Sequence, residues 1–303
     1  MKLMELDMGL TGPLSSVNEG VNMKKLLVFQ SDFGLVDGAV AAMYGVAFEV
    51  DENLRAYNLT HDIPPYNIWE ASYRLFQAME YWPDDTVFVS VVDPGVGSVR
   101  KSVVAKTVNG QYVVTPDNGT LTHLKKYVGI EAVREIEESK HRRKDTEHSY
   151  TFHGRDVYAY TGAKLASGTI EFVEVGRELS VEGIIELETN DVISSGKSIK
   201  GSIDILDVRF GSLWTNISRE DFTRLGFQFG DKVEVIIRNG PRAIYNNRIT
   251  YGKSFADVYI SEQIIYVNSL YRMAIAINQG NFAKAYNIST DPSWTVEFKK
   301  IND

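Results

Sequence analysis

The sequence predicts an α/β domain with a mainly parallel sheet, followed by a smaller β-barrel domain. In the first half, short apolar runs end in polar loops and alternate with helix-like stretches, a pattern typical of strand–helix–strand units. From about residue 195, strand-like segments follow one another without a long helix, as in a barrel or sandwich. The chain has 303 residues and 44% hydrophobic content, enough for two buried cores. We expect an extension or upstream start over 1–22, the α/β domain over 23–193 and the barrel over 194–303.

In the first domain, strands are expected where apolar and β-branched residues run together: Leu26–Phe29, Ala56–Leu59, Thr86–Val92, Val103–Lys106 and Tyr112–Val114. Helices are expected over the longer stretches between and after them: Gly38–Val50, Ile68–Tyr81 and Arg155–Ala166. Polar loops follow four of the strands: Ser31–Asp37, Thr60–Tyr66, Asp93–Arg100 and Pro116–Thr120. If these strands are parallel, the loops meet at one edge of the sheet, where open α/β sheets bind ligands.

In the second domain, the expected strands are Gly201–Leu206, Lys232–Arg238, Ala243–Ile249, Ile264–Val267 and Met273–Ile277. Polar and aromatic residues gather between them, at Asp207–Asn216, Asn268–Arg272 and Asn278–Asn281. Each cluster alone fits hairpin-turn chemistry. Together they indicate a polar surface suited to an amino-acid zwitterion.

Composition excludes several classes of function. The chain has no cysteine, which excludes disulfides, zinc–thiolate sites, iron–sulfur clusters and thiol nucleophiles. Its net charge of −8 disfavours a nucleic-acid binder that relies on a basic surface. No apolar run approaches the ~20 residues needed to cross a bilayer, so we expect no membrane span and a cytoplasmic protein. Metal-binding motifs are also absent, and we expect no metal.

Three motifs carry candidate chemistry, and a fourth, a run of basic residues, does not. Asp32 follows the first strand, where it can bind ribose hydroxyls; no kinase motif surrounds it. Asp93 and Arg100 enclose a tight Pro/Gly loop and form either a structural or a catalytic pair. His153 precedes a helix, beside a glycine that permits close approach of a ligand. The basic run 140–144 is flanked by acidic residues and is read as a solvated face.

Taken together, seven motifs in order resemble one family, the S-adenosyl-L-methionine (SAM) hydroxide adenosyltransferases. This family was once a domain of unknown function, DUF62, and is related to fluorinase and chlorinase. The motifs run from residue 31 to residue 269: Ser31-Asp32-Phe33-Gly34, Thr60-His61-Asp62-Ile63-Pro64, Asp93-Pro94-Gly95-Val96-Gly97, Thr115-Pro116-Asp117-Asn118-Gly119, Phe152-His153-Gly154-Arg155-Asp156, Phe210-Gly211 with Trp214-Thr215-Asn216, and Asn268-Ser269.

The resemblance implies a homotrimer whose active sites lie between the N-terminal domain of one subunit and the C-terminal domain of the next. It also implies a hydrolase that converts SAM to adenosine and methionine without a cofactor. The implied catalytic residues are Asp93, Arg100 and His153. The implied substrate-binding residues are Asp32, Asp37, Tyr66, Asp207, Phe210, Ser212, Ser269 and Arg272.

The catalytic trio also separates this chain from the halogenases it resembles. Fluorinase-like members carry tyrosines at the positions of Asp93 and His153, and a serine where Gly154 stands. We expect Arg100 and a protonated His153 to lower the pKa of a bound water, with Asp93 orienting the pair or accepting the proton. The alternatives are a SAM or nucleoside sensor with little turnover, a metal-dependent phosphatase using Asp32, and a halogenase.

Overall fold

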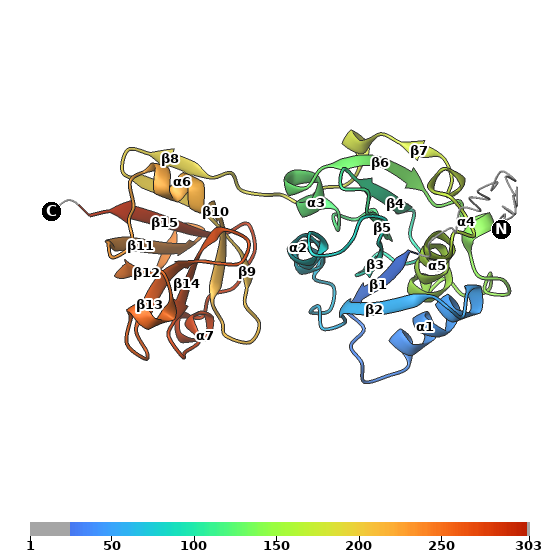
Figure 1. Cartoon of the computed structure of the whole chain (residues 1–303), viewed down its shortest axis with the longest axis horizontal. Helices are drawn as coiled ribbons and strands as arrows, with labels where there is room; N and C mark the ends of the chain where they lie inside the picture. The colour runs from blue at the N-terminus through green and yellow to red at the C-terminus, as the bar shows by residue number, and fades with distance from the viewer. Residues whose placement is uncertain (1–24, 302–303) are drawn as a thin grey trace, which may run out of the picture.

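The computed structural model describes residues 25–301 and confirms the predicted fold class. The chain forms an α/β domain and a β-barrel domain that lie next to each other (Figure 1). The extension predicted over 1–22 lies outside the described residues.

A seven-stranded sheet organises the first domain, in the order β2-β1-β3-β5-β4-β6-β7. Its strands are β1 Leu26–Ser31, β2 Arg55–Thr60, β3 Val87–Val91, β4 Ser102–Thr107, β5 Tyr112–Pro116, β6 Ile130–Glu135 and β7 Glu178–Leu179. The strands β2, β1, β3 and β5 are parallel neighbours, as predicted. The other three add antiparallel pairs, and β6 and β7 were not predicted from the sequence.

Helices cover both faces of this sheet (Figure 1). They are α1 Ala39–Val50, α2 Ile68–Met79, α3 Thr122–Tyr127, α4 Glu138–His141, the π-helical turn η1 Gly154–Ala159 and α5 Tyr160–Ser167, with short 3₁₀ turns η2 Phe172–Glu174 and η3 Val181–Gly183. Alternation along β1 assigns the faces, because successive strand residues point to opposite sides. Leu27 and Phe29 pack in the core under α1, η1 and α5. Val28 packs in the core that holds Leu75 of α2 and Leu124 of α3.

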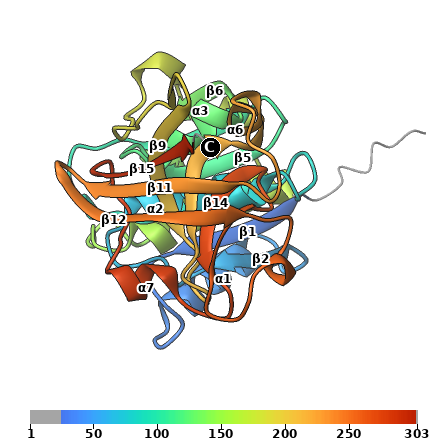
Figure 2. The ribbon, with the colours of Figure 1, turned by 90° about the vertical axis from the view of Figure 1, so that its left-hand side faces the viewer.

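The second domain is a closed barrel of seven strands with an eighth attached (Figure 2). Its strands are β8 Ile193–Ser195, β9 Ser198–Leu206, β10 Leu213–Ser218, β11 Lys232–Asn239, β12 Arg242–Tyr251, β13 Gln263–Val267, β14 Arg272–Ile277 and β15 Trp294–Lys300. Pairing of β9 with β10 closes the ring, and β8 extends it from β9. Three short helical segments lie between strands: α6 Arg219–Arg224, η4 Phe255–Asp257 and α7 Phe282–Tyr286.

The two domains are in direct contact through α2 and β9. The Trp69 indole N–H donates to the Asp204 carbonyl at 2.6 Å, and Arg74 Nη2 donates to the Leu206 carbonyl at 3.0 Å. Tyr73 of α2 is fully buried against Trp214 of the barrel. Among the described residues, no helix has the length and apolar character that a membrane span requires.

Candidate active site

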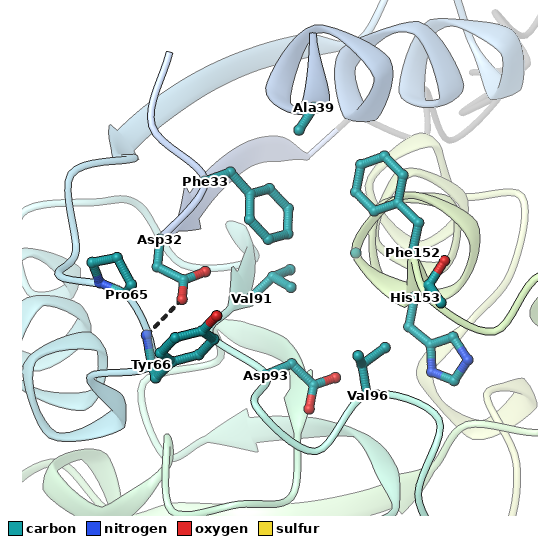
Figure 3. A pocket seen from close by; sticks show the side chains of 12 residues that line it. Asp32, Phe33, Ala39, Pro65, Tyr66, Val91, Asp93, Val96, Phe152 and His153 are labelled. Carbon is teal, nitrogen blue, oxygen red and sulfur yellow. Dashed lines mark hydrogen bonds between the residues drawn. The ribbon is translucent and has the colours of Figure 1, made fainter. Parts of the chain in front are cut away.

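A pocket of about 620 Å³ opens at the carboxyl edge of the parallel strands, a size typical of small-molecule sites. Three of the four predicted polar loops contribute to it, together with the segment that leads into η1 (Figure 3). Its lining residues are Asp32, Phe33, Ala39, Pro65, Tyr66, Val91, Asp93, Val96, Thr151, Phe152, His153 and Gly154. The fourth loop supports the site from behind, because Asn118 Nδ2 donates to the Val92 carbonyl at 2.9 Å.

Asp32 and Tyr66 form one side of this pocket. The Tyr66 backbone N–H donates to Asp32 Oδ2 at 2.8 Å, which ties the first polar loop to the second (Figure 3). Tyr66 has a φ of 67°, and the residue is 72% exposed although it lines the pocket. This arrangement places a fixed carboxylate and an aromatic face side by side, as recognition of a sugar requires.

Asp93 and Arg100 form a buried ion pair at the floor of the site. Arg100 Nε donates to Asp93 Oδ1 at 2.8 Å, and Arg100 Nη2 donates to Oδ2. Backbone turns return the chain on itself, since the Val96 N–H donates to the Asp93 carbonyl at 3.2 Å. The two side chains are only 5% and 9% exposed. The predicted pairing across the Pro/Gly loop is therefore present, and its geometry is bidentate.

His153 lies beside this pair at the start of η1, with 5% of its surface exposed. Its Nδ1 is 3.1 Å from Arg100 Nη2, and its Nε2 is 2.9 Å from Arg142 Nη2. Burial lowers the pKa of His153, and the two guanidinium groups act in the same direction, whereas Glu138 and Asp93 oppose them. Burial and the two neighbouring guanidinium groups thus act against the protonated His153 that the sequence led us to expect.

The pocket wall between Asp32 and His153 is apolar. The rings of Phe33 and Phe152 meet edge to face with centroids 5.7 Å apart. A Cβ on Gly154 would lie 3.0 Å from Phe33 and 3.2 Å from Val91. A side chain at this position would therefore fit only if the Phe33 and Val91 side chains shifted by a few tenths of an ångström.

A second pocket, of about 740 Å³, lies on the barrel domain. Its lining residues are Asp207, Arg209, Phe210, Ser212, Phe255, Tyr266, Ile277, Asn278, Gln279, Gly280 and Asn281. Asp207 Oδ1 accepts from the backbone N–H groups of Arg209 and Phe210 at 3.2 and 3.3 Å, which shapes the turn after β9. The two pockets share no lining residue.

Three predicted substrate residues line neither pocket. Asp37 is exposed, and its Oδ1 accepts from the Ala39 N–H at 2.9 Å at the start of α1. Ser269 is exposed in the turn between β13 and β14. Arg272 lies at the contact between the domains, where its guanidinium stacks 4.2 Å from the centroid of Tyr127.

Sequence reasoning missed Arg142, which it placed on a solvated face. The prediction is wrong for this residue: the Arg142 side chain is only 8% exposed, and its Nη2 contacts both Glu138 and His153. Its neighbour His141 is also buried, at 3% exposure. The available signal was the spacing of Glu138 and Arg142, four residues apart on one helix turn.

The remaining buried histidines have structural partners. His61 lies between Ser31 Oγ at 2.7 Å and Asn58 Oδ1 at 2.8 Å, and burial lowers its pKa to about 4. His123 contacts Ser72 Oγ at 2.9 Å, and burial lowers its pKa to about 3. Over residues 25–301, no three His, Asp or Glu side chains are grouped so that they could hold a metal ion.

Both domains of this chain match known protein families and named relatives. The family description "SAM hydroxide adenosyltransferase N-terminal domain" matches residues 27–176, and the corresponding C-terminal domain matches 201–295. An (R)-S-adenosyl-L-methionine hydrolase of Methanocaldococcus jannaschii is 31% identical, covering 87% of this chain and 92% of that protein. A fluorinase of Actinoplanes sp. is 26% identical, covering 91% and 98%.

Solved structures also match this chain over most of its length. An uncharacterized conserved protein from Thermotoga maritima superposes with a TM-score of 0.82 at 31% identity, covering 91% of this chain and all of that one. A conserved hypothetical protein from Thermus thermophilus superposes with a TM-score of 0.68 at 27% identity, covering 90% and 99%. With both domains matched over most of its length, the chain belongs to the SAM hydroxide adenosyltransferase family.

Proposed function

We propose that this protein hydrolyses S-adenosyl-L-methionine to adenosine and L-methionine, by in-line attack of a water-derived oxygen on C5′. The observation that carries the proposal is the Asp93–Arg100–His153 cluster at the floor of the first pocket. Three relatives at 29% to 31% identity are named (R)-S-adenosyl-L-methionine hydrolase, which supports the same reaction here.

The chemistry requires little beyond placement of the nucleophile. SAM is a sulfonium, so methionine leaves as a neutral thioether and no general acid is needed. Holding a water in line with the C5′–sulfur bond can contribute ~7–11 kcal/mol. Asp93, paired with Arg100, orients the water or accepts its proton, and His153 contacts the same cluster. Because these groups interact, they titrate as a unit.

The substrate-binding residues follow from the two pockets. We assign the ribose hydroxyls to Asp32 and the sugar face to Tyr66 in the first pocket, and the adenine side to Phe210 and Ser212 in the second. Asp207 binds the methionine end. Ser269 is the proposed partner of the methionine carboxylate, and Asp37 and Arg272 stay proposed substrate-binding residues. None of the three lines either pocket within one subunit.

We further propose a homotrimer in which the first pocket of one subunit closes against the second pocket of the next. Two features support this arrangement. The pockets share no residue within one chain, and the aromatic residues that border them, Tyr66 and Phe210, are 72% and 70% exposed. Exposed aromatic rings beside a polar pocket are typical of surfaces that a partner covers. SAM is the proposed substrate, with no cofactor, and the cytoplasm is the proposed location.

The test of the activity is chromatography of purified protein incubated with SAM in chloride-containing buffer. Equal amounts of adenosine and methionine are expected. A chlorinated nucleoside would instead identify a halogenase, and unchanged SAM with measurable binding would identify a sensor. Phosphate release that EDTA abolishes would identify a phosphatase.

The shared site is tested by mixing two variants, His153→Ala and Asp207→Ala, after co-refolding. If each site combines two subunits, random assembly restores roughly one quarter of the sites, because only one pairing in four joins two intact pockets. Activity equal to the sum of the separate variants would contradict the shared site.

A further inference from the structure

His153 has an arginine at each of its ring nitrogens, an arrangement that the reaction as described does not use. Arg100 Nη2 lies 3.1 Å from Nδ1, and Arg142 Nη2 lies 2.9 Å from Nε2. A guanidinium offers only N–H donors, and an uncharged imidazole has one lone pair and one N–H. Only one of the two contacts can therefore be a hydrogen bond at a time. A protonated ring would face two cations with no acceptor for either of its N–H groups.

Arg142 is fixed in place by several partners. Its Nη2 lies 2.7 Å from Glu138 Oε2, and its guanidinium stacks on the Tyr150 ring, 5.2 Å from the centroid. Ser102 Oγ donates to Glu138 Oε1 at 3.2 Å and accepts from Arg100 Nη1 at 3.0 Å. The two arginines are thus joined through Ser102 and Glu138.

The two arginines differ in how much they depend on His153. Arg100 donates to both oxygens of Asp93 and to Ser102, so it keeps three hydrogen bonds if it releases the ring. Among the described residues, Arg142 Nη1 is buried without a partner, and the acceptors that contact its Nη2 are Glu138 and His153 Nε2. Releasing the ring leaves one N–H of either guanidinium unpaired, at a cost of about 1–3 kcal/mol. Arg142 would then keep a hydrogen bond only to Glu138, whereas Arg100 would keep three, so we place the single lone pair on Nε2.

We propose that Arg142, anchored by Glu138, is a positioning residue that donates to Nε2 of His153 and so holds the ring uncharged with its proton on Nδ1. This nitrogen lies on the Asp93 side, as Figure 3 shows for the ring and the carboxylate. The Nδ1–H can then donate to the attacking oxygen and fix its lone pairs, which leaves Asp93 as the proton acceptor. The catalytic consequence rests on the proposed function, whereas the position of the proton does not.

The charged and titratable groups that face the His153 ring come from four segments of the chain. They are Asp93 and Arg100 from the loop after β3, Glu138 and Arg142 from α4 and its end, Tyr150 from the following loop, and Tyr158 of η1, whose hydroxyl lies 3.5 Å from Asp93 Oδ2. Removal of Arg142 takes away a cation and moves titration of the ring to higher pH. Removal of the charge on Glu138 moves it to lower pH, because that carboxylate favours the protonated ring.

The experiment is ¹⁵N NMR of the histidine rings in the full chain without substrate, with His153 assigned by its loss in His153→Ala. We expect wild-type His153 as the uncharged Nδ1–H form at neutral pH. In Arg142→Met, the proton moves to Nε2, because Arg100 now donates to Nδ1, and titration shifts to higher pH. Glu138→Gln shifts the titration of His153 to lower pH. Arg142→Lys, which keeps the positive charge, returns the titration toward its wild-type pH. Arg143→Met is the matched control, because Arg143 pairs with Glu49 at 2.7 Å on the surface and leaves His153 unchanged.

Two results would overturn the proposal: an Nε2–H ring in the wild-type protein, or the same form and titration in wild type and Arg142→Met. Because neither readout needs turnover, failure of the proposed hydrolysis would be seen separately. With SAM, Arg142→Met should lower kcat up to roughly 10²-fold, the cost of a misplaced catalytic group, while KM changes little. The acid limb of its pH profile should move to higher pH, and a purely structural role would leave that limb in place.

Discussion

Removal of the charge on Asp93 tests the catalytic floor of the first pocket. Asp93→Asn keeps the shape of the side chain but leaves Arg100 buried, at 9% exposure, without a counter-charge. Breaking a buried ion pair from one side costs about 3–5 kcal/mol. For a domain of this size, about 2–4 °C is lost per kcal/mol, so we expect a drop in Tm of roughly 6–20 °C. Turnover should fall by ~10²–10⁴, the usual contribution of a positioned acid–base group.

The double variant Asp93→Leu with Arg100→Met separates stability from activity. Replacing both members of a buried pair with apolar side chains is neutral or stabilising by ~1–4 kcal/mol, so Tm should recover. Activity should not recover, because the water loses both of its polar partners. Glu220→Gln is the control: its pair with Arg224 is 83% and 65% exposed and should shift stability by less than ~1 kcal/mol.

The assays are calorimetry for Tm and chromatography for adenosine formed from SAM. If Asp93→Asn keeps both the wild-type Tm and the wild-type rate, the pair is neither buried nor catalytic, and the reasoning is refuted. If the double variant regains activity along with Tm, Asp93 acts on the reaction only through stability.

Three further outcomes are expected. Asp32→Ala should raise KM by ~10–100-fold with little change in kcat, because a charge-assisted hydrogen bond to the ribose contributes about 1.5–3 kcal/mol; an unchanged KM would remove Asp32 from the substrate site. Gly154→Ser places a Cβ 3.0 Å from Phe33 and should cost about 1–3 kcal/mol of stability and weaken SAM binding, both measured by calorimetry. Gly45→Ala, where a Cβ would meet no atom within 4 Å, should change neither stability in this direction nor SAM binding. Burial raises the pKa of Asp204 from 3.8 to about 6, so between these pH values the folded state holds a proton that the unfolded state releases. The resulting contribution to stability is full below pH 3.8 and is lost as pH rises through about 6. Asp204→Asn should remove that loss, and parallel curves of Tm against pH for the two proteins would contradict this prediction.

The sequence predicted the parallel half of the first domain well because its signals are local. Each of the strands β1, β2, β3 and β5 is a short apolar run that ends in polar loop residues, and parallel pairing brings those ends to one edge. The strands β6 and β7 escaped prediction. β6 mixes charged and apolar residues and is mostly half-buried, and β7, at the edge of the sheet, has only two residues. Their pairing depends on contacts far along the chain.

The candidate site was predictable where a residue follows a strand, as with Asp32 and Asp93. The site was not predictable where the role of a residue depends on its surroundings in the folded protein. Arg142 lies in a run of charged residues that reads as surface, and only the fold buries it against His153. The pKa of His153 is lowered by burial and by two arginines that lie 53 and 11 residues away in the sequence. A sequence lists such groups but does not place them.

The most direct test of water attack at C5′ is a reaction with SAM in H₂¹⁸O, with adenosine analysed by mass spectrometry. Hydrolysis by the Asp93–Arg100–His153 cluster predicts adenosine that carries one ¹⁸O at its 5′ position, formed together with unlabelled methionine, and a lower rate in His153→Ala. Adenosine without the label, or no adenosine from protein that binds SAM, would contradict the proposed reaction.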